Sequence, residues 1–94
     1  MKSDYKLYEK NINGDIWQIY LTRYDKLVRI TCDLMRPNRK FYQSKILYSD
    51  YTYCDGENIN SWEELANDVI DNYYHQQEIK NKLMSFLKKL LTNN

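Results

Sequence analysis

Glycine and proline are scarce in this sequence, whose 94 residues include two glycines and one proline. Because these two residues interrupt helices and strands, their scarcity predicts a chain that is mostly regular secondary structure. The same scarcity argues against nucleotide-binding loops, which need several glycines so that backbone amides can approach a phosphate. Neither a G-x-G-x-x-G pattern nor a P-loop pattern occurs in the sequence.

Long apolar runs are also missing. The polar start, Met1–Asp4, leads into a charged segment, and no later run approaches the length that a membrane span requires. We therefore expect no signal peptide, no membrane partner and a cytoplasmic location, which is the host-cell cytoplasm if the protein is encoded by a phage. Cys32 and Cys54 are expected to be free thiols, because disulfides are rare in that compartment.

Residues suited to catalysis or metal binding are few. His75 is the only histidine, and nothing in the sequence pairs with it as a general base requires. Cys54 stands beside Asp55, and a neighbouring carboxylate disfavours a thiolate, whereas Cys32 lies on the apolar side of a predicted strand. Placing Gly56 at the sixth position of a calcium-binding loop puts tyrosines where carboxylates belong. We expect no cofactor, no metal and no enzymatic activity.

Alternation of apolar and polar residues predicts four strands in the first half of the chain. The Asn13-Gly14 pair, a strong signal for a hairpin turn, separates the first two strands. Pro37 interrupts the pattern after the third strand, because proline cannot donate to a sheet ladder. The expected strands occupy residues 5–12, 15–23, 27–35 and 40–48.

Ser61 marks the start of the helical half. With Glu64 three residues later it forms a capping-box pattern, and apolar residues then recur every three or four positions. The apolar stripe before Tyr74 is offset around the helix from the stripe after Ile79. Residues 61–91 are therefore predicted to form either one long helix or two consecutive helices.

Together these elements predict an α+β fold. An antiparallel β-meander of three to four strands is followed by one long or two consecutive C-terminal α-helices packed on one sheet face. The length suits a single domain over residues 1–94. Within it we expect the sheet in 5–48, an acidic loop at 49–60 and the helical region in 61–91.

Charge is segregated along the chain, although the formal net charge is only +1. Residues 1–49 contain ten basic and five acidic residues, residues 50–78 contain eight acidic and no basic residues, and residues 79–94 contain four lysines and no acid. Acids near a helix start and lysines near a helix end suit the helix dipole, which accounts for part of the pattern. It does not account for the three acids that precede the predicted helix.

Tyrosine is abundant, with ten residues, and two of them, Tyr51 and Tyr53, lie in the predicted acidic loop at 49–60. Tyrosine is favoured at binding surfaces because it offers contact area with little side-chain entropy to lose. Half-buried tyrosines on a small sheet, in a sequence with AT-rich codons, explain the count equally well. The predicted partner-binding surface comprises Asp50, Tyr51, Tyr53, Asp55, Glu57, Glu64, Asp68 and Asp71.

The leading functional hypothesis is a small non-enzymatic binding protein. An acidic, tyrosine-bearing surface suits a basic site on a larger host protein, and nucleic-acid-handling proteins such as CRISPR effectors and nucleases have such sites. The protein is then an anti-CRISPR-like inhibitor that acts as a nucleic-acid mimic. Richness in Asn, Lys, Ile and Tyr, whose codons are AT-rich, indicates a phage or another mobile element as its source.

The alternative hypothesis is a small DNA- or RNA-binding regulator that uses the basic face of the sheet. Basic and aromatic residues interleaved on strands bind nucleic acid through phosphate contacts and base stacking. Lysine and arginine at sheet edges also prevent aggregation, which is an ordinary structural reason for their presence. The residues concerned are Arg23, Arg29, Arg36, Arg39 and Lys40.

The last part of the predicted helix carries an apolar stripe that is longer than a small sheet needs. We expect it to form a seam for self-association, giving a homodimer, or for contact with another partner. The seam consists of Ile79, Leu83, Phe86 and Leu90.

Overall fold

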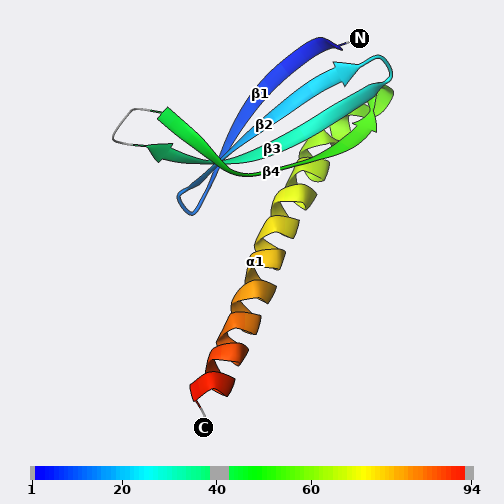
Figure 1. The fold of residues 1–94 in the computed structure, drawn as a ribbon. Coiled ribbons are helices and arrows are strands. Elements are labelled where there is room, and N and C mark those ends of the chain that lie inside the picture. The colour runs from blue at the N-terminus through cyan, green and yellow to red at the C-terminus, as the bar shows by residue number, and fades with distance from the viewer. Residues whose placement is uncertain (1, 39–42, 93–94) are drawn as a thin grey trace.

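The computed structural model describes residues 2–38 and 43–92, with side chains for 6–36 and 45–92. Four antiparallel strands form one sheet in the order β1-β2-β3-β4, and a long helix crosses one face of the sheet (Figure 1). This is the predicted α+β fold, with an antiparallel meander followed by a C-terminal helix. The elements are β1 Lys2–Ile12, β2 Asp15–Tyr24, β3 Leu27–Asn38, β4 Gln43–Asp55, the 3-10 helix η1 Gly56–Ser61 and the helix α1 Trp62–Thr92.

Two tight turns place the first three strands side by side. Asn13 and Gly14 both have positive φ, at 51° and 94°, as a type I′ hairpin turn requires. Asn11 Oδ1 accepts a hydrogen bond from the Gly14 N–H at 2.9 Å, so the hairpin predicted here is confirmed. Asp25 in the second turn has a φ of 55°, a conformation that aspartate adopts more readily than most residues.

The fourth strand extends further than the sequence suggested. β4 continues to Asp55 and η1 follows directly, so the acidic loop predicted at residues 49–60 is wrong. The predicted start of this strand, at residues 40–42, lies outside the described residues. The described part of β4 begins at Gln43.

The length of β3 explains this difference. Every β3 residue from Leu27, opposite Asp55, to Leu34, opposite Tyr48, has a partner on β4, so the backbone of the acidic segment gains hydrogen bonds by pairing. Its tyrosines and threonine also favour a strand. Because β4 is an edge strand, the carboxylate of Asp50 reaches solvent at the sheet edge without a full desolvation cost.

The helical region is one continuous helix of 31 residues, not two consecutive helices. It begins at Trp62, directly after Ser61, close to the predicted start. The Ser61 hydroxyl donates a hydrogen bond to the Asn58 carbonyl oxygen at 3.1 Å and so closes the last turn of η1. The offset between the two apolar stripes does not mark a break, because only the first stripe packs against the sheet.

The core lies between the sheet and the N-terminal half of α1. Alternate residues of β2 and β3 point into it, and α1 contributes Ala66 and Ile70, which are 0% and 1% exposed. Tyr8 of β1 stacks on Trp62 with ring centroids 4.2 Å apart, which covers the core on the β1 side. The buried apolar residues are Trp17, Ile19, Leu21, Val28, Ile30, Cys32, Leu34, Cys54, Ala66 and Ile70.

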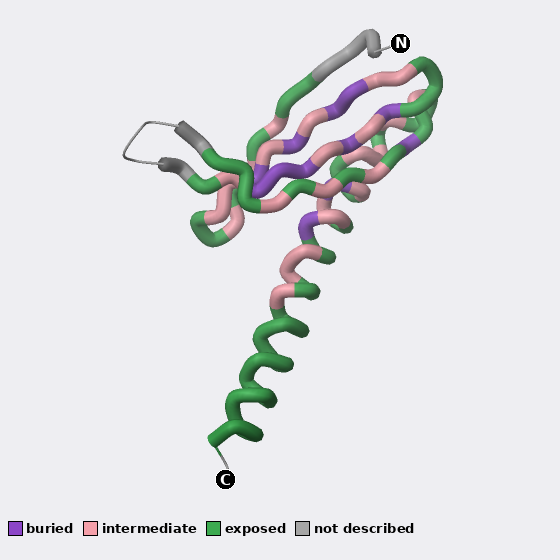
Figure 2. Tube along the Cα trace, in the orientation of Figure 1, coloured by how far each residue is buried: buried purple, intermediate pink, exposed green. Residues whose placement is uncertain are grey.

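The C-terminal half of α1 projects beyond the sheet. Every residue from Glu78 to Thr92 is exposed, as Figure 2 shows by colour. Within the described ranges, no helix is both long enough and apolar enough to cross a membrane. The helix therefore has a half that closes the core and a half whose described residues are all exposed.

Candidate binding surfaces

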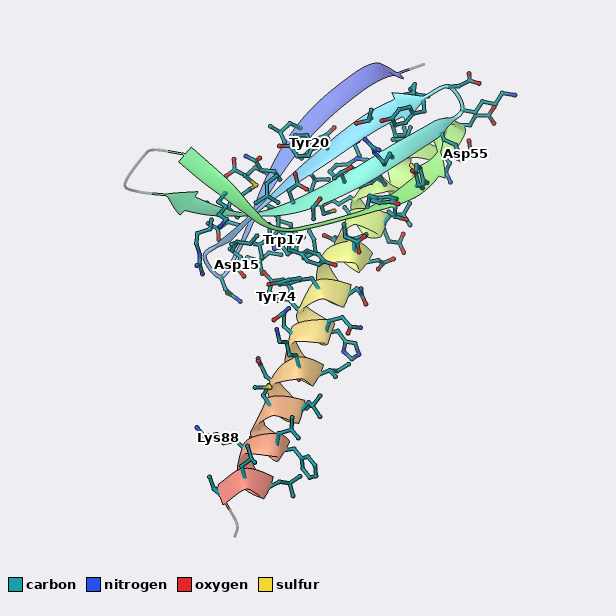
Figure 3. The ribbon with its side chains drawn as sticks, in the orientation of Figure 1. Asp15, Trp17, Tyr20, Asp55, Tyr74 and Lys88 are labelled. Carbon is teal, nitrogen blue, oxygen red and sulfur yellow. The ribbon has the colours of Figure 1, made fainter. Side chains whose placement is uncertain are left out.

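The sheet has one covered face and one open face. Trp17 lies between the sheet and α1, whereas Tyr20, three residues later, lies on the opposite side of the sheet (Figure 3). Register partners in an antiparallel sheet point to the same side. Tyr20 therefore shares the open face with its register partners Leu7 and Thr31, and with Tyr51, which is the partner of Thr31 on β4.

Tyr51 and Tyr53 form an exposed aromatic pair on the open face of β4. Their rings meet edge to face with centroids 5.6 Å apart, and the two residues are 57% and 49% exposed. Asp55 and Glu57 follow them and are also exposed. Asp55 Oδ1 accepts a hydrogen bond from the Glu57 N–H at 3.0 Å, which holds the start of η1. We call these four residues the Tyr–carboxylate surface.

Gly56 fixes the corner at which this surface ends. Its N–H donates to the Lys26 carbonyl oxygen at 2.8 Å, which ties η1 to the turn between β2 and β3. A Cβ atom at Gly56 would lie 2.8 Å from the Arg23 guanidinium and 3.0 Å from that same carbonyl oxygen. The close approach of the two backbones therefore requires glycine at this position.

Glu64, Asp68 and Asp71 lie on a different part of the molecule. All three are exposed on α1, and their spacing of four and three residues places them on one helix face. Ala66, two residues from both Glu64 and Asp68, is fully buried against the sheet. This helix acidic face therefore points away from the sheet, on the opposite side from Tyr51.

Asp50 belongs to neither group. It is the register partner of Cys32, so it points to the covered side at the edge of the sheet, and it is half-buried. Its Oδ1 accepts from the Tyr51 N–H at 2.8 Å and its Oδ2 accepts from the Tyr48 hydroxyl at 3.3 Å. The eight residues predicted as one partner-binding surface are thus distributed over three places.

The predicted basic residues are divided between the two faces of the sheet. Arg23 points to the covered side beside η1, whereas Arg29 lies on the open face. Arg36 is exposed towards the end of β3. Arg39 and Lys40 lie outside the described residues. The arginines that the structure describes do not gather on one face.

The open face carries more acid than base. Arg29 places its guanidinium carbon 5.2 Å from the centroid of the Tyr24 ring, within reach of a cation–π interaction, and its buried Nε has no hydrogen-bond partner among the described residues. The register places Glu9, Asp33 and Asp55 on the same face. Among the described side chains of the strands on the open face, three are acidic and one, Arg29, is basic.

The two thiols are poor candidates for chemistry. Both are free and buried. Burial, followed by two nearby aspartates, raises the pKa of Cys32 to about 12. Burial also raises the pKa of Cys54, with a further rise from Asp55 and an opposing effect of Arg23. A protonated thiol is a weak nucleophile.

His75 is exposed on α1, and the described residues contain no cluster of three or more metal-ligating side chains.

The predicted seam lies on the projecting half of α1. Its four residues are between 47% and 59% exposed, and no described part of the chain covers them, so its role in self-association stays a prediction. Three further apolar residues of this half are exposed beside it. The exposed apolar residues of the projecting half are Ile79, Leu83, Met84, Phe86, Leu87, Leu90 and Leu91.

Sequence reasoning did not place Tyr20 and Tyr24 on the same face of the sheet as Tyr51. Both are half-buried on the open side, and the Tyr20 hydroxyl donates to Gln18 Oε1 at 2.8 Å. The alternation along β2 was a usable signal, because it separates these tyrosines from Trp17. Their distance from Tyr51 in sequence hid the relation, which only the register across β3 reveals.

Comparison of the chain with protein families, curated proteins and solved structures found no match.

Proposed function

We propose that this chain is a small, non-enzymatic inhibitor of phage or mobile-element origin that occupies a basic, nucleic-acid-binding site on a larger host protein. A CRISPR effector or a nuclease is the expected kind of target. The Tyr–carboxylate surface makes the contact. The aromatic pair supplies buried area, and the carboxylates meet the arginines and lysines that normally hold phosphates.

The observation that carries this proposal is the exposure of Tyr51 and Tyr53 beside two exposed carboxylates, those of Asp55 and Glu57. Solvent-exposed tyrosines that pack on each other are already oriented, so little side-chain entropy is lost when a partner covers them. The segment 50–78 that contains them has eight acidic and no basic residues. Of these acids, Asp55 and Glu57 lie next to the tyrosine pair, where their carboxylates attract a basic surface and repel nucleic acid.

Direct nucleic-acid binding is the second candidate function, and Arg29 over Tyr24 is the observation that favours it. An arginine and tyrosines on one sheet face resemble the stacking platforms that hold single-stranded bases. Affinity for nucleic acid comes mainly from several phosphate contacts, and the described arginines lie on different faces. The charge balance of the open face therefore favours a protein partner.

The proposal is tested by inhibition of purified enzymes. The full chain is titrated into DNA-cleavage assays with a panel of CRISPR effector nucleases and other nucleases. We expect dose-dependent inhibition of at least one, weakened by about tenfold or more in Asp55→Lys/Glu57→Lys, because charge reversal turns attraction into repulsion across the same contact. Tyr51→Ala/Tyr53→Ala should also weaken it and leaves the η1 cap intact.

The helix acidic face supplies the matched control. Glu64→Lys/Asp68→Lys reverses the same amount of charge on exposed residues that point away from the open face, so it should retain most of the inhibition. Equal loss in both charge-reversal variants means that total charge, not the Tyr–carboxylate surface, governs the effect. Inhibition that is unchanged in Asp55→Lys/Glu57→Lys and in Tyr51→Ala/Tyr53→Ala overturns the assignment.

A further inference from the structure

The projecting half of α1 is strongly amphipathic and packs against none of the other elements that the structure describes. We call residues 79–92 the C-terminal tail. Its seven apolar side chains are between 43% and 78% exposed, and it carries four lysines and no acid. Figure 3 shows Lys88 on this part of the helix, clear of the sheet. An apolar surface of this extent on a helix normally marks a contact site.

The apolar surface of the tail is wider than a coiled-coil seam. At about 100° per residue, the predicted seam residues form a narrow stripe, and Met84, Leu87 and Leu91 widen it on one side to an arc of about 160°. Lys82 and Lys89 border the arc on one side and Lys88 borders it on the other, whereas Lys80 lies within it. A two-helix coiled coil buries only the narrow stripe, so a broader surface fits this tail better.

A second copy of the chain is a poor occupant because of charge. An antiparallel pair of tails that opposes Leu83 to Phe86 of the second copy also brings Lys82 towards Lys89 of that copy. A parallel pair brings eight lysines together with no acid in either tail. Like charges at such positions oppose association. The occupant that complements the tail is therefore anionic.

We infer that the C-terminal tail binds an anionic lipid surface. The helix lies in the plane of the headgroups with its apolar arc towards the acyl chains, while the lysines at its borders extend their ammonium groups to lipid phosphates. Fourteen helical residues span about 21 Å, which is too short to cross a bilayer core of about 30 Å. The expectation of no membrane partner rested on the lack of a spanning segment, and surface binding needs none.

The geometry of the helix permits this contact. The centre of the apolar arc is turned by roughly a quarter of the circumference from the face that Ala66 and Ile70 present to the sheet. The arc therefore does not face in the direction in which the sheet lies. The acidic segment 50–78 is repelled by an anionic surface, which confines the contact to the tail. The inference does not depend on the proposed inhibitory function.

Vesicle cosedimentation of the full chain tests this inference. Vesicles of phosphatidylcholine alone are compared with vesicles that also contain phosphatidylglycerol, at low and high salt. We expect binding to the anionic vesicles only, weakened by salt, and weakened by roughly fivefold for each tail lysine removed. Lys88→Gln/Lys89→Gln tests the charges, and Leu83→Ser/Phe86→Ser tests the apolar arc. Both pairs are exposed and make no contact with the sheet, so the fold is preserved.

Lys26→Gln is the matched control, because Lys26 is an exposed lysine in the turn between β2 and β3. It should bind vesicles as the unaltered chain does. Absence of binding to anionic vesicles overturns the inference, as does binding that survives in Leu83→Ser/Phe86→Ser. Sedimentation equilibrium is run in parallel. If the unaltered chain is a dimer that does not bind vesicles, and the dimer dissociates in Leu83→Ser/Phe86→Ser, the tail binds a second copy of the chain. If the unaltered chain is a monomer that does not bind vesicles, the remaining occupant of the tail is an acidic protein.

Discussion

The hydroxyl of Tyr74 donates a hydrogen bond to Asp15 Oδ2 at 2.7 Å. The same hydroxyl accepts a hydrogen bond from Trp17 Nε1 at 3.0 Å. The two bonds connect α1 with the first residues of β2, which lie 59 and 57 positions away in sequence. Trp17 is 0% exposed, and its indole N–H has its partner in this phenol. The pair therefore fixes the helix against the sheet at the point where α1 leaves the core.

Tyr74→Phe is expected to destabilise the protein by about 1–3 kcal/mol, because it leaves the buried Trp17 N–H unpaired. Denaturant unfolding followed by circular dichroism measures this cost. Tyr73→Phe is the control, since the Tyr73 ring packs edge to face on Trp17 at 5.4 Å and the ring is retained. If Tyr73→Phe lowered the free energy of unfolding as much as Tyr74→Phe, the hydrogen bonds of the Tyr74 hydroxyl would not explain the loss.

Ile70→Ala should cost about 2–5 kcal/mol, because Ile70 is 1% exposed and its removal leaves a cavity between helix and sheet. Ala66→Leu should cost about 1–3 kcal/mol through overpacking, since Ala66 is 0% exposed in the core. Asn72→Ala, at an exposed position of the same helix, is the reference substitution. Thermal melts in which Ile70→Ala behaves like Asn72→Ala would contradict the described packing of α1 on the sheet.

Stability should fall at alkaline pH, partly through Cys32. Its pKa is raised from 9.0 to about 12 in the folded protein by burial, so the folded state holds the thiol proton more tightly than the unfolded chain. The resulting stabilisation is fully present below pH about 9 and is lost as the pH rises towards about 12. Urea unfolding at pH about 8 and about 10.5 measures the difference.

Cys32→Val should show a smaller alkaline loss than the unaltered protein, because it removes one of the groups whose pKa is raised. The pKa of Tyr74 is also raised, mainly by burial. Tyr74 therefore contributes in the same direction, and Cys32→Val should still lose some stability at alkaline pH. Thr52→Val, a non-titrating change on the same sheet face, is the control and should leave the pH dependence unchanged. An identical alkaline loss in all three proteins would remove Cys32 from this account.

Removal of residues 79–94 should change the free energy of unfolding by less than about 1 kcal/mol, because every described residue of that segment is exposed. Circular dichroism should show a loss of helix signal with the sheet and the core retained. Truncation before Ile70 is the contrasting variant and should unfold the protein. A truncated chain that aggregates or melts much earlier would mean that the tail packs against the domain in solution.

The strands that are bounded by their own turn signals could be predicted from the sequence. The extension of β4 could not, because it depends on pairing with β3. Asn13 and Gly14 fix a local backbone geometry, so the first hairpin was predictable from two residues. Residues 49–55 carry charge and no strong apolar alternation, and they form a strand because β3 provides partners for them. That stabilisation comes from residues more than ten positions away and leaves no local signature.

The candidate site was likewise predictable where its residues are neighbours in the sequence and not where they are far apart in it. Tyr51, Tyr53 and Asp55 were predicted from composition alone, and the structure places them together. The grouping with Glu64 and Asp68 did not hold, because α1 turns those side chains away from the sheet. Charge segregation along a sequence carries no information about the side of the molecule on which each charge lies, which depends on strand register and helix rotation.

One mobility-shift experiment tests the central claim most directly. Labelled duplex DNA is bound by a nuclease that the protein inhibits, and the protein is then added at low salt, alongside lanes that contain DNA and the protein without the enzyme. The account predicts that the enzyme–DNA band disappears, that the protein alone shifts no DNA, and that Asp55→Lys/Glu57→Lys leaves the enzyme–DNA band in place. A shift caused by the protein alone and abolished in Arg29→Glu would contradict the account and identify a nucleic-acid-binding protein.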